Sequence, residues 1–402
     1  MGEIIRQSYL DKIEKYIGKE TIIVLVGQRR VGKSCMLKMV RDMKASDDRN
    51  NVIFIDKEKR EFDNIKNYND LNDFIEERFD KSKHNFIFID EVQDIDGFER
   101  SVRSYRTEEN TDIIITGSNA KMLSSDLTTL IGGRYKEIYI QPLSYLEFLQ
   151  FHKLQDSEDS LAKYMKYGGL PGLVKMGLEE DDVREYHSDI YNTVLLKDVI
   201  MRHEIRNVQF LENLVRFLAD NTGQLVSANS ISKFMKSQKE SVTSTVIMNY
   251  ISYLCEAYMI HKVNRFDIHG KRLFENNDKF YFEDHGLRNT LAGGTRENDI
   301  EKVIENIVFQ QLVRLGYTVK VGKLPSGEID FVCSKPNGKL IYVQASYLIA
   351  ADETRKREFG NLGSIKDNYP KYVISMNPLL TKSDFDGITH IHLRTFLTEE
   401  DF

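Results

Sequence analysis

Over about the first 140 residues, the hydrophobic and polar positions follow two patterns in turn, one typical of strands and one typical of helices. Short apolar runs with the length of buried strands are separated by segments whose apolar positions recur at helical spacing. Strands that alternate with helices are typical of a parallel sheet flanked by helices. The pattern therefore predicts an α/β module, with strands at 21–26, 52–56, 86–90, 112–116 and 137–140 and helices at 35–44 and 70–79.

The pattern becomes helical after residue 142. Ser144 stands three residues before Glu147, which predicts a capped helix start, and the glycine-rich segment 168–172 interrupts the helices. Three helical patterns and two alternating segments follow, which is typical of a winged helix. The helices are expected at 208–220, 229–235 and 241–256, and the strands at 258–266 and 279–283 on either side of a turn at 269–270.

A second, smaller α/β unit is predicted after Gly293-Gly294. Its apolar segments again have the lengths of strands and are mixed with helical patterns. The helices are expected at 299–315 and 354–368, and the strands at 318–321, 328–333, 339–344 and 372–376.

Composition narrows the class of protein. A chain of 402 residues with 41% hydrophobic and 29% charged residues is typical of a soluble globular protein of several domains. No apolar run has the ~20 residues that a membrane helix needs, and the N-terminus contains acidic residues and no apolar h-region, so it does not resemble a secretory signal. The three cysteines lie far apart, which disfavours a zinc site and favours the reducing cytoplasm. A net charge of −6 means that any nucleic-acid contact requires a local basic patch.

The segment Gly27-Gln28-Arg29-Arg30-Val31-Gly32-Lys33-Ser34 matches the phosphate-binding loop GxxxxGK[ST] at every fixed position. The two glycines let the loop turn its backbone N–H groups toward a phosphate, and Lys33 supplies a positive charge. The hydroxyl of Ser34 is expected to be a ligand for Mg²⁺. We therefore expect nucleotide contacts from Gly27, Gln28, Arg29, Arg30, Val31, Gly32, Lys33, Ser34 and Cys35.

Two carboxylates, Asp90 and Glu91, end the apolar run at 86–89. At a strand tip, Asp90 is expected to hold Mg²⁺ and Glu91 to act as the general base for water. Polar residues also follow the next apolar run, at 113–115. Asn119 is the first candidate to align that water, and Ser118 is the second. Arg134, after Gly132-Gly133, is a candidate to stabilise γ-phosphate charge in cis or in trans.

The motifs GQRRVGKS, FIFIDE, ITGSN, GGRY, QPLSYLEF, YGGLPGLV and LLKDVIMR together resemble AAA+ ATPases of the archaeal-type ATPase group, as does the C-terminal stretch from YVQASYLI. These proteins pair an AAA module with a C-terminal domain of unknown function. The resemblance implies ATP as the nucleotide, a homo-oligomer, and Arg134 as an arginine finger. The expected domains are an ATPase core (1–141), a helical lid (142–206), a winged helix (207–292) and a nuclease-like α/β domain (293–402).

The winged helix carries a modest local excess of positive charge. Residues 231 to 280 include five acidic residues and eight basic ones. The basic residues are Lys233, Lys236, Lys239, Lys262, Arg265, Lys271, Arg272 and Lys279. Arg265, Lys271 and Arg272 lie near the expected wing, so we expect contacts with the backbone of duplex DNA. The alternative is a packing or oligomerisation module, because helix 241–256 has an apolar face that includes Val246, Ile247, Tyr250, Ile251 and Leu254.

The C-terminal unit resembles PD-(D/E)XK nucleases in layout, with Glu305 on a helix and Glu328 and Asp330 on a strand. Gln344 stands where an acid is usual and Ser346 where a lysine is usual. A neutral amide is a weak metal ligand and a serine supplies no positive charge. We therefore expect an inactive nuclease-like fold. An active metal site with Glu305, Asp330 and Gln344, helped by Lys356, remains the alternative.

Together these features predict a Mg²⁺-dependent ATP hydrolase that acts as a DNA-associated switch or remodeller in the cytoplasm. ATP rather than GTP rests on the resemblance and on the lack of an Asn-Lys-x-Asp guanine motif. Two alternatives stay open. One is an ATP-regulated assembly sensor that acts on a protein partner and hydrolyses slowly. The other is an ATP-regulated nuclease in defence against foreign DNA.

Overall fold

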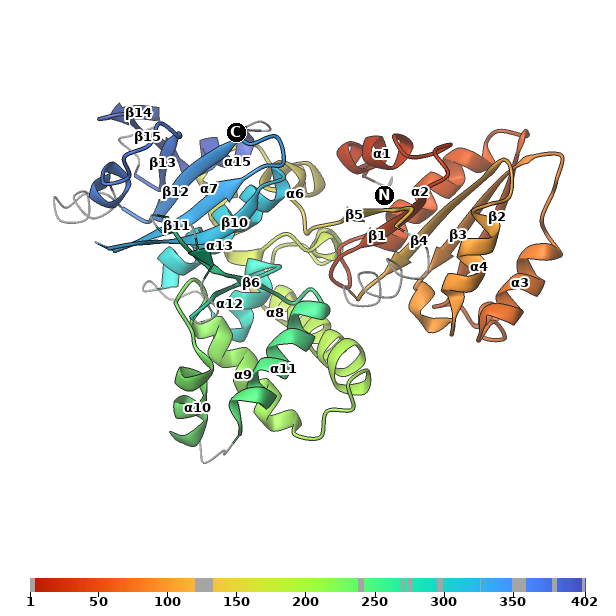
Figure 1. Ribbon diagram of the computed structural model, residues 1–402, viewed down its shortest axis with the longest axis horizontal. Coiled ribbons are helices and arrows are strands. Elements are labelled where there is room, and N and C mark those ends of the chain that lie inside the picture. The colour runs from red at the N-terminus through yellow and green to blue at the C-terminus, as the bar shows by residue number, and fades with distance from the viewer. Residues whose placement is uncertain are drawn as a thin grey trace. The chain divides into compact units, whose positions relative to one another are not determined.

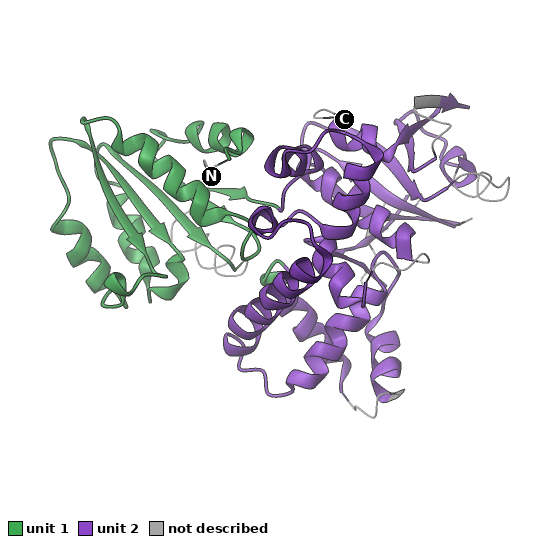
Figure 2. Cartoon of the chain, turned by 180° about the vertical axis from the view of Figure 1, so that it is seen from behind, with its two compact units in different colours: residues 1–141, 256–258 green, residues 142–255, 259–402 purple. Residues whose placement is uncertain are grey.

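The computed structural model describes residues 4–119, 133–237, 242–268, 270, 272–273, 277–294, 299–325, 327–348, 359–377, 382–399 and 402. The chain forms two compact units (Figure 2). Unit 1 contains residues 1–141 and 256–258, and unit 2 contains residues 142–255 and 259–402. The end of unit 1 coincides with the expected end of the ATPase core.

Unit 1 is built on a five-stranded parallel sheet with the order β2-β3-β4-β1-β5, which confirms the predicted α/β module. Both faces of the central strands are buried, so each of these strands contains a continuous apolar run. The strands are β1 (Ile22–Val26), β2 (Asn50–Asp56), β3 (His84–Asp90), β4 (Thr111–Gly117) and β5 (Tyr135–Tyr139).

Helices cover the two faces of this sheet (Figure 1). One core joins alternate strand residues such as Val24 and Ile89 to Leu71 of α3 (Tyr68–Glu76) and Val102 of α4 (Phe98–Tyr105). The P-loop helix α2 (Lys33–Ala45) and α1 (Gln7–Glu14) pack on the other side. This arrangement brings the carboxyl ends of all five strands to one edge of the sheet.

Helices make up the first part of unit 2. The predicted capping box is confirmed, because Glu147 N donates to Ser144 Oγ (3.1 Å) and Ser144 N donates to Glu147 Oε2 (2.8 Å). The helices are α6 (Tyr145–His152), α7 (Glu158–Tyr167), α8 (Glu180–Thr193) with its π-helical continuation (Val194–Met201), α9 (Val208–Asp220), α10 (Ala228–Ser237), α11 (Ser244–Glu256) and α12 (His285–Leu291).

The second part of unit 2 is an eight-stranded sheet with the order β14-β15-β13-β12-β11-β10-β7-β8. Helices α13 (Ile300–Arg314) and α15 (Leu393–Thr398) pack against it. Of the expected helix at 354–368, residues 359–363 are helical and residues 354–358 lie outside the described part. The strands are β7 (Arg265–Asp267), β8 (Arg272–Leu273), β10 (Thr318–Leu324), β11 (Gly327–Ser334), β12 (Leu340–Ser346), β13 (Lys371–Ser375), β14 (Lys382–Phe385) and β15 (Ile388–His392).

The expected two-stranded ribbon forms only in part. Strand β6 (Ile260–Val263) pairs with β9 (Lys279–Phe282) as predicted. The continuous strand expected at 258–266 is wrong, because the chain leaves the ribbon at Asn264 and β7 pairs with β10. This pairing satisfies backbone groups of β10 that would otherwise lie at a sheet edge. The described wing residues therefore extend the C-terminal sheet, and the winged helix itself stays a prediction.

A buried segment at the start of α12 ties the helical parts of unit 2 together. Asp284 accepts hydrogen bonds from Gly169 N (2.7 Å) and Leu287 N (2.8 Å), and Asn289 donates to the carbonyls of Met165 and Lys166. A Cβ atom on Gly286 would lie 2.1 Å from the carbonyl oxygen of Tyr167, so glycine is required there. The division of unit 2 into lid, winged helix and nuclease-like domain stays a prediction.

Candidate functional site

The loop between β1 and α2 has the backbone geometry that its two glycines permit. Gly27 has φ +139° and Gly32, at the N-terminus of α2, has φ +101°. A Cβ atom on Gly27 would lie 2.2 Å from the carbonyl oxygen of Ile140, so only glycine fits. The N-terminus of a 13-residue helix thus faces the loop, where its free N–H groups favour an anion.

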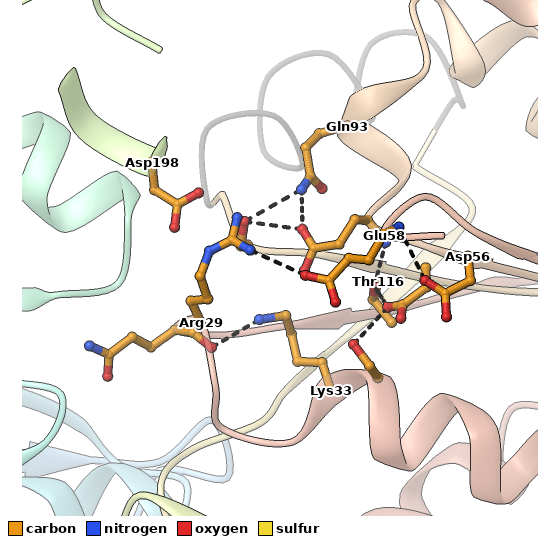
Figure 3. Close-up of polar contacts among 12 residues, drawn as sticks. Arg29, Lys33, Asp56, Glu58, Gln93, Thr116 and Asp198 are labelled. Carbon is orange, nitrogen blue, oxygen red and sulfur yellow. Dashed lines mark hydrogen bonds and ion pairs between the residues drawn. The ribbon is translucent and has the colours of Figure 1, made fainter. Parts of the chain in front are cut away.

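Lys33 lies inside this loop. Its side chain is buried, and Nζ donates to the carbonyl oxygens of Gly27 (2.8 Å) and Gln28 (2.9 Å) (Figure 3). The other residues expected to bind the nucleotide form the loop and the first turn of α2. Gln28 and Val31 are buried, Arg29 pairs with Glu58 (3.5 Å), and Arg30 and Cys35 are exposed.

The carboxylate of Asp90 joins the loop helix to two strands. Its Oδ1 accepts hydrogen bonds from Ser34 Oγ (3.0 Å) and Thr116 Oγ1 (2.6 Å). Its Oδ2 is buried and has no hydrogen-bond partner among the described residues. Burial raises the pKa of Asp90, the two hydroxyl groups lower it, and the charges of Glu91 and Asp56 raise it again, so that it lies above its usual value. A buried carboxylate oxygen beside a hydroxyl group is a donor set that suits Mg²⁺.

Glu91 follows in a left-handed backbone conformation with φ +53°, which is uncommon for a residue other than glycine. Its backbone N–H donates to Thr116 Oγ1 (2.9 Å). Its Oε2 accepts hydrogen bonds from the side-chain amide of Gln93 and from Ser118 Oγ (3.3 Å). The general-base candidate is therefore held by two neutral donors, of which Gln93 was not expected from the sequence.

Asp56 is a further acid that the sequence reasoning missed. It ends β2 and pairs in register with Asp90 at the end of β3. Lys38 on α2 forms an ion pair with Asp56 (3.1 Å). Burial lowers the pKa of Lys38, but the hydrogen bond to Asp56 and its charge raise it above the usual value. The repeated pattern of an apolar run ending in aspartate, at 52–56 and 86–90, is the signal that identifies Asp56.

The remaining candidate site residues, Ser118, Asn119 and Arg134, lie at different ends of the sheet. Ser118 and Asn119 are buried directly after β4, which lies between β3 and β1. Arg134 is exposed and precedes β5, and its carbonyl oxygen accepts a hydrogen bond from Ile22 N (3.2 Å) at the start of β1. The loop follows the other end of β1, four residues later, which is roughly 13 Å away at ~3.3 Å per residue. This position does not support a role in cis, and the role in trans stays a prediction.

The nuclease-like residues gather in unit 2. Glu305 on α13 and Glu328 and Asp330 on β11 all contact Lys279 of β9. Gln344 accepts a hydrogen bond from Asp330 N (3.2 Å). Lys356 lies outside the described residues. Within the described ranges, no group of three histidine, cysteine, aspartate or glutamate side chains is arranged to hold a metal ion.

Part of the basic patch expected to contact DNA is already neutralised. Lys279 is buried among carboxylates, and Lys262 pairs with Asp278 (3.0 Å). Lys233 and Lys236 are exposed on α10, whereas α11, the expected recognition helix, carries no basic residue. Lys239, Lys271 and the side chain of Arg272 lie outside the described part of the chain.

A bacterial protein matches this chain over nearly its whole length. A Haemophilus influenzae protein, named only as uncharacterized, is 35% identical over 405 residues, covering 98% of this chain and 99% of that protein. The chain belongs to the family of that protein. Residues 19–149 of this family member match the AAA domain model, which confirms the resemblance to AAA proteins in unit 1. Residues 158–298 match a domain family of unknown function.

Two more distant proteins are similar. An uncharacterized protein of Methanocaldococcus jannaschii is 28% identical over 337 residues, covering 80% of this chain and 74% of that protein. A Walker-type ATPase of Pyrococcus abyssi superposes with a TM-score of 0.53 at 14% identity, covering 72% of this chain and 96% of that chain. The superposition shows a shared fold. No helix in the described part of this family member has the length and apolarity needed to cross a membrane.

Proposed function

We propose that this AAA protein is a Mg²⁺-dependent ATPase whose reaction takes place at the carboxyl edge of the sheet in unit 1. The observation that carries the proposal is the buried Asp90 carboxylate, which is held by the hydroxyl groups of Ser34 and Thr116 and keeps one oxygen without a partner among the described residues. Lys33 lies in the adjacent loop. A phosphate chain bound to that loop would have both a lysine and a metal ligand within reach.

The residues divide the work of hydrolysis. The backbone of residues 27–35 binds the phosphates, and the ammonium of Lys33 exchanges its carbonyl contacts for phosphate oxygens. Ser34 and Asp90 would hold Mg²⁺, and the bound ion would supply positive charge that offsets the charge of the phosphates. Glu91 accepts a proton from the attacking water, which Asn119 orients. Arg134 completes the site from a neighbouring subunit, which is why we propose a homo-oligomer.

The hydrogen bonds that hold Glu91 support slow basal hydrolysis. A carboxylate that accepts from Gln93 and Ser118 has fewer lone pairs available for water. A partner that shifts Gln93 or Ser118 would raise the rate. This arrangement fits both a DNA-associated switch or remodeller and the rival role, a sensor whose ATP-bound form holds a protein assembly together.

DNA is the partner that we propose first. Lys233 and Lys236 are exposed on α10, where they are suited to contact phosphates. Fewer basic residues are available to contact DNA than the sequence suggested, because Lys262 and Lys279 form ion pairs with acidic residues. For the third role, an ATP-regulated nuclease, the neutral Gln344 and Ser346 in place of an acid and a lysine argue against cleavage.

The deciding experiment is the steady-state ATPase rate, with and without duplex DNA, for the wild type, Glu91→Gln and the double variant Lys233→Glu/Lys236→Glu. Stimulation by DNA that is lost in the double variant supports the DNA-coupled role. A basal rate that DNA does not change supports a protein partner. Turnover no faster than that of Glu91→Gln, despite tight ATP binding, would contradict the ATPase and favour the sensor. Metal-dependent cleavage of the same DNA would support the nuclease.

A further inference from the structure

A buried lysine in unit 2 is surrounded by three carboxylates. Lys279 begins β9 and is 3% exposed. Its Nζ lies 2.8 Å from Oε1 of Glu305, 2.8 Å from Oε1 of Glu328 and 3.0 Å from Oδ1 of Asp330. Three acidic oxygens thus converge on one positive centre, at the distances of hydrogen bonds to an ammonium group rather than those of metal ligands.

Two of the carboxylates also accept hydrogen bonds from groups other than Lys279. Tyr281 OH donates to Glu305 Oε1 (2.6 Å), and Ala345 N donates to Asp330 Oδ2 (3.0 Å). A Cβ atom on Gly223 would lie 2.8 Å from Glu305 Oε2, so the glycine leaves room for that oxygen. The side chains of Glu305 and Glu328 keep 16% and 28% of their exposure, so an ion from solvent can reach the cluster.

We propose that the ammonium group of Lys279 is the built-in cation of this carboxylate cluster and takes the place that a divalent metal ion would otherwise occupy. It thereby fixes β9 to α13 and β11 and keeps the C-terminal α/β part of the chain without a metal. The proposal goes beyond the ATPase function, since it concerns residues of unit 2 alone. Its physical basis is charge, because three carboxylates this close together repel one another unless a cation lies between them.

Removal of the ammonium should therefore create a metal site. In Lys279→Met the carboxylates of Glu305, Glu328 and Asp330 remain and lose their counter-ion. Mn²⁺ prefers oxygen ligands of this kind, and in this variant no ammonium group competes with it for them. The matched control is Lys262→Met, because Lys262 lies on the adjacent strand β6 and pairs with one acid, Asp278.

The test is Mn²⁺ binding to the full chain without nucleotide, measured by electron paramagnetic resonance and by thermal unfolding. In the wild type we expect no Mn²⁺ binding that depends on Asp330, so Asp330→Asn should leave its Mn²⁺ binding unchanged. Lys279→Met should bind Mn²⁺ about tenfold or more tightly than the wild type, lose this binding in Lys279→Met/Asp330→Asn, and unfold at a higher temperature with Mn²⁺. Lys262→Met should gain no site.

Two results would overturn the proposal. The first is Asp330-dependent Mn²⁺ binding to the wild type, which would mean that Lys279 does not exclude the metal. The second is a Lys279→Met variant that gains no Mn²⁺ site, either as a folded protein or after refolding in the presence of Mn²⁺. In that case the acids do not form a metal-like set.

Discussion

The hydroxyl of Thr116 lies 2.6 Å from Oδ1 of Asp90, to which it donates a hydrogen bond. The same hydroxyl oxygen accepts a hydrogen bond from the backbone N–H of Glu91 (2.9 Å). Thr116 therefore fixes the proposed metal ligand and the proposed general base at once, from the neighbouring strand β4.

Thr116→Val should reduce the ATPase rate roughly five- to thirtyfold, because it removes hydrogen bonds to the two acids of about 1–2 kcal/mol in total while keeping the shape of the side chain. Thr116→Ser keeps the hydroxyl group and should stay within about threefold of the wild type. Steady-state hydrolysis at saturating Mg²⁺ measures both variants. Equal losses in valine and serine variants would show that packing, rather than the hydroxyl group, matters here.

Asp90→Asn should stabilise the nucleotide-free protein at pH 8 while abolishing stabilisation by ATP and Mg²⁺. Folding raises the pKa of Asp90, so its protonated form favours the fold. That contribution is complete below the unfolded pKa of about 4 and is lost as the pH rises through the folded value, where the ionised form is penalised. Thermal unfolding with and without ATP and Mg²⁺ tests this. A nucleotide-free Asn variant less stable than the wild type at pH 8 would refute the prediction.

Gln93→Ala should raise the basal ATPase rate about three- to tenfold, because Glu91 loses a hydrogen bond of about 1 kcal/mol that competes with water. Glu91→Gln/Gln93→Ala is the control and should be inactive. The measurement is the rate without any partner. If Gln93→Ala instead slows hydrolysis, Gln93 orients Glu91 for catalysis and does not restrain it.

Arg134→Ala should lower hydrolysis roughly a hundredfold or more with little change in ATP binding, as expected for an arginine finger. Because Arg134 lies at the far end of β1 from the loop, we expect it to act on a neighbouring subunit. Mixing Arg134→Ala with Glu91→Gln should then restore activity, since an intact Arg134 meets an intact Glu91 at mixed interfaces. Absence of recovery in mixtures that assemble would rule out the role in trans.

Glu305→Gln should flatten the pH dependence of the stability of unit 2. Burial raises the pKa of Glu305 to about 7, although the charge of Lys279 acts in the opposite direction. The stabilising contribution of the protonated form is therefore complete below the unfolded pKa of about 4.3 and is lost as the pH rises through about 7.

The wild type should thus lose up to roughly 1.4 kcal/mol per pH unit relative to Glu305→Gln between about pH 5 and 7. Urea unfolding at several pH values measures this difference. Glu301→Gln is the matched control, because Glu301 is exposed on the same helix and should leave the pH dependence unchanged. A constant difference between Glu305→Gln and the wild type across this range would contradict a raised pKa.

The sequence by itself determined the phosphate loop, the strands of unit 1 and several helices. The phosphate loop is local in sequence. It includes Gly27, Gly32, Lys33 and Ser34 within eight consecutive positions, so their spacing determines the geometry that the structure shows. The helix at 208–220 was predicted with its observed bounds, because its apolar face repeats at the period of the helix itself. Such features depend on interactions between residues a few positions apart.

Only the tertiary structure decided which distant residues meet. Thr116 reaches Asp90 because β4 lies beside β3, and Lys279 reaches Asp330, 51 positions away, because β9 packs against β11 and α13. Strand β7 joined the C-terminal sheet although its own pattern fits a ribbon, and Arg134 lies away from the loop because of the register of β5 on β1. Periodicity encodes the form of each element, whereas the partner of a buried charge depends on which elements are adjacent, and that is settled by the packing of the whole unit.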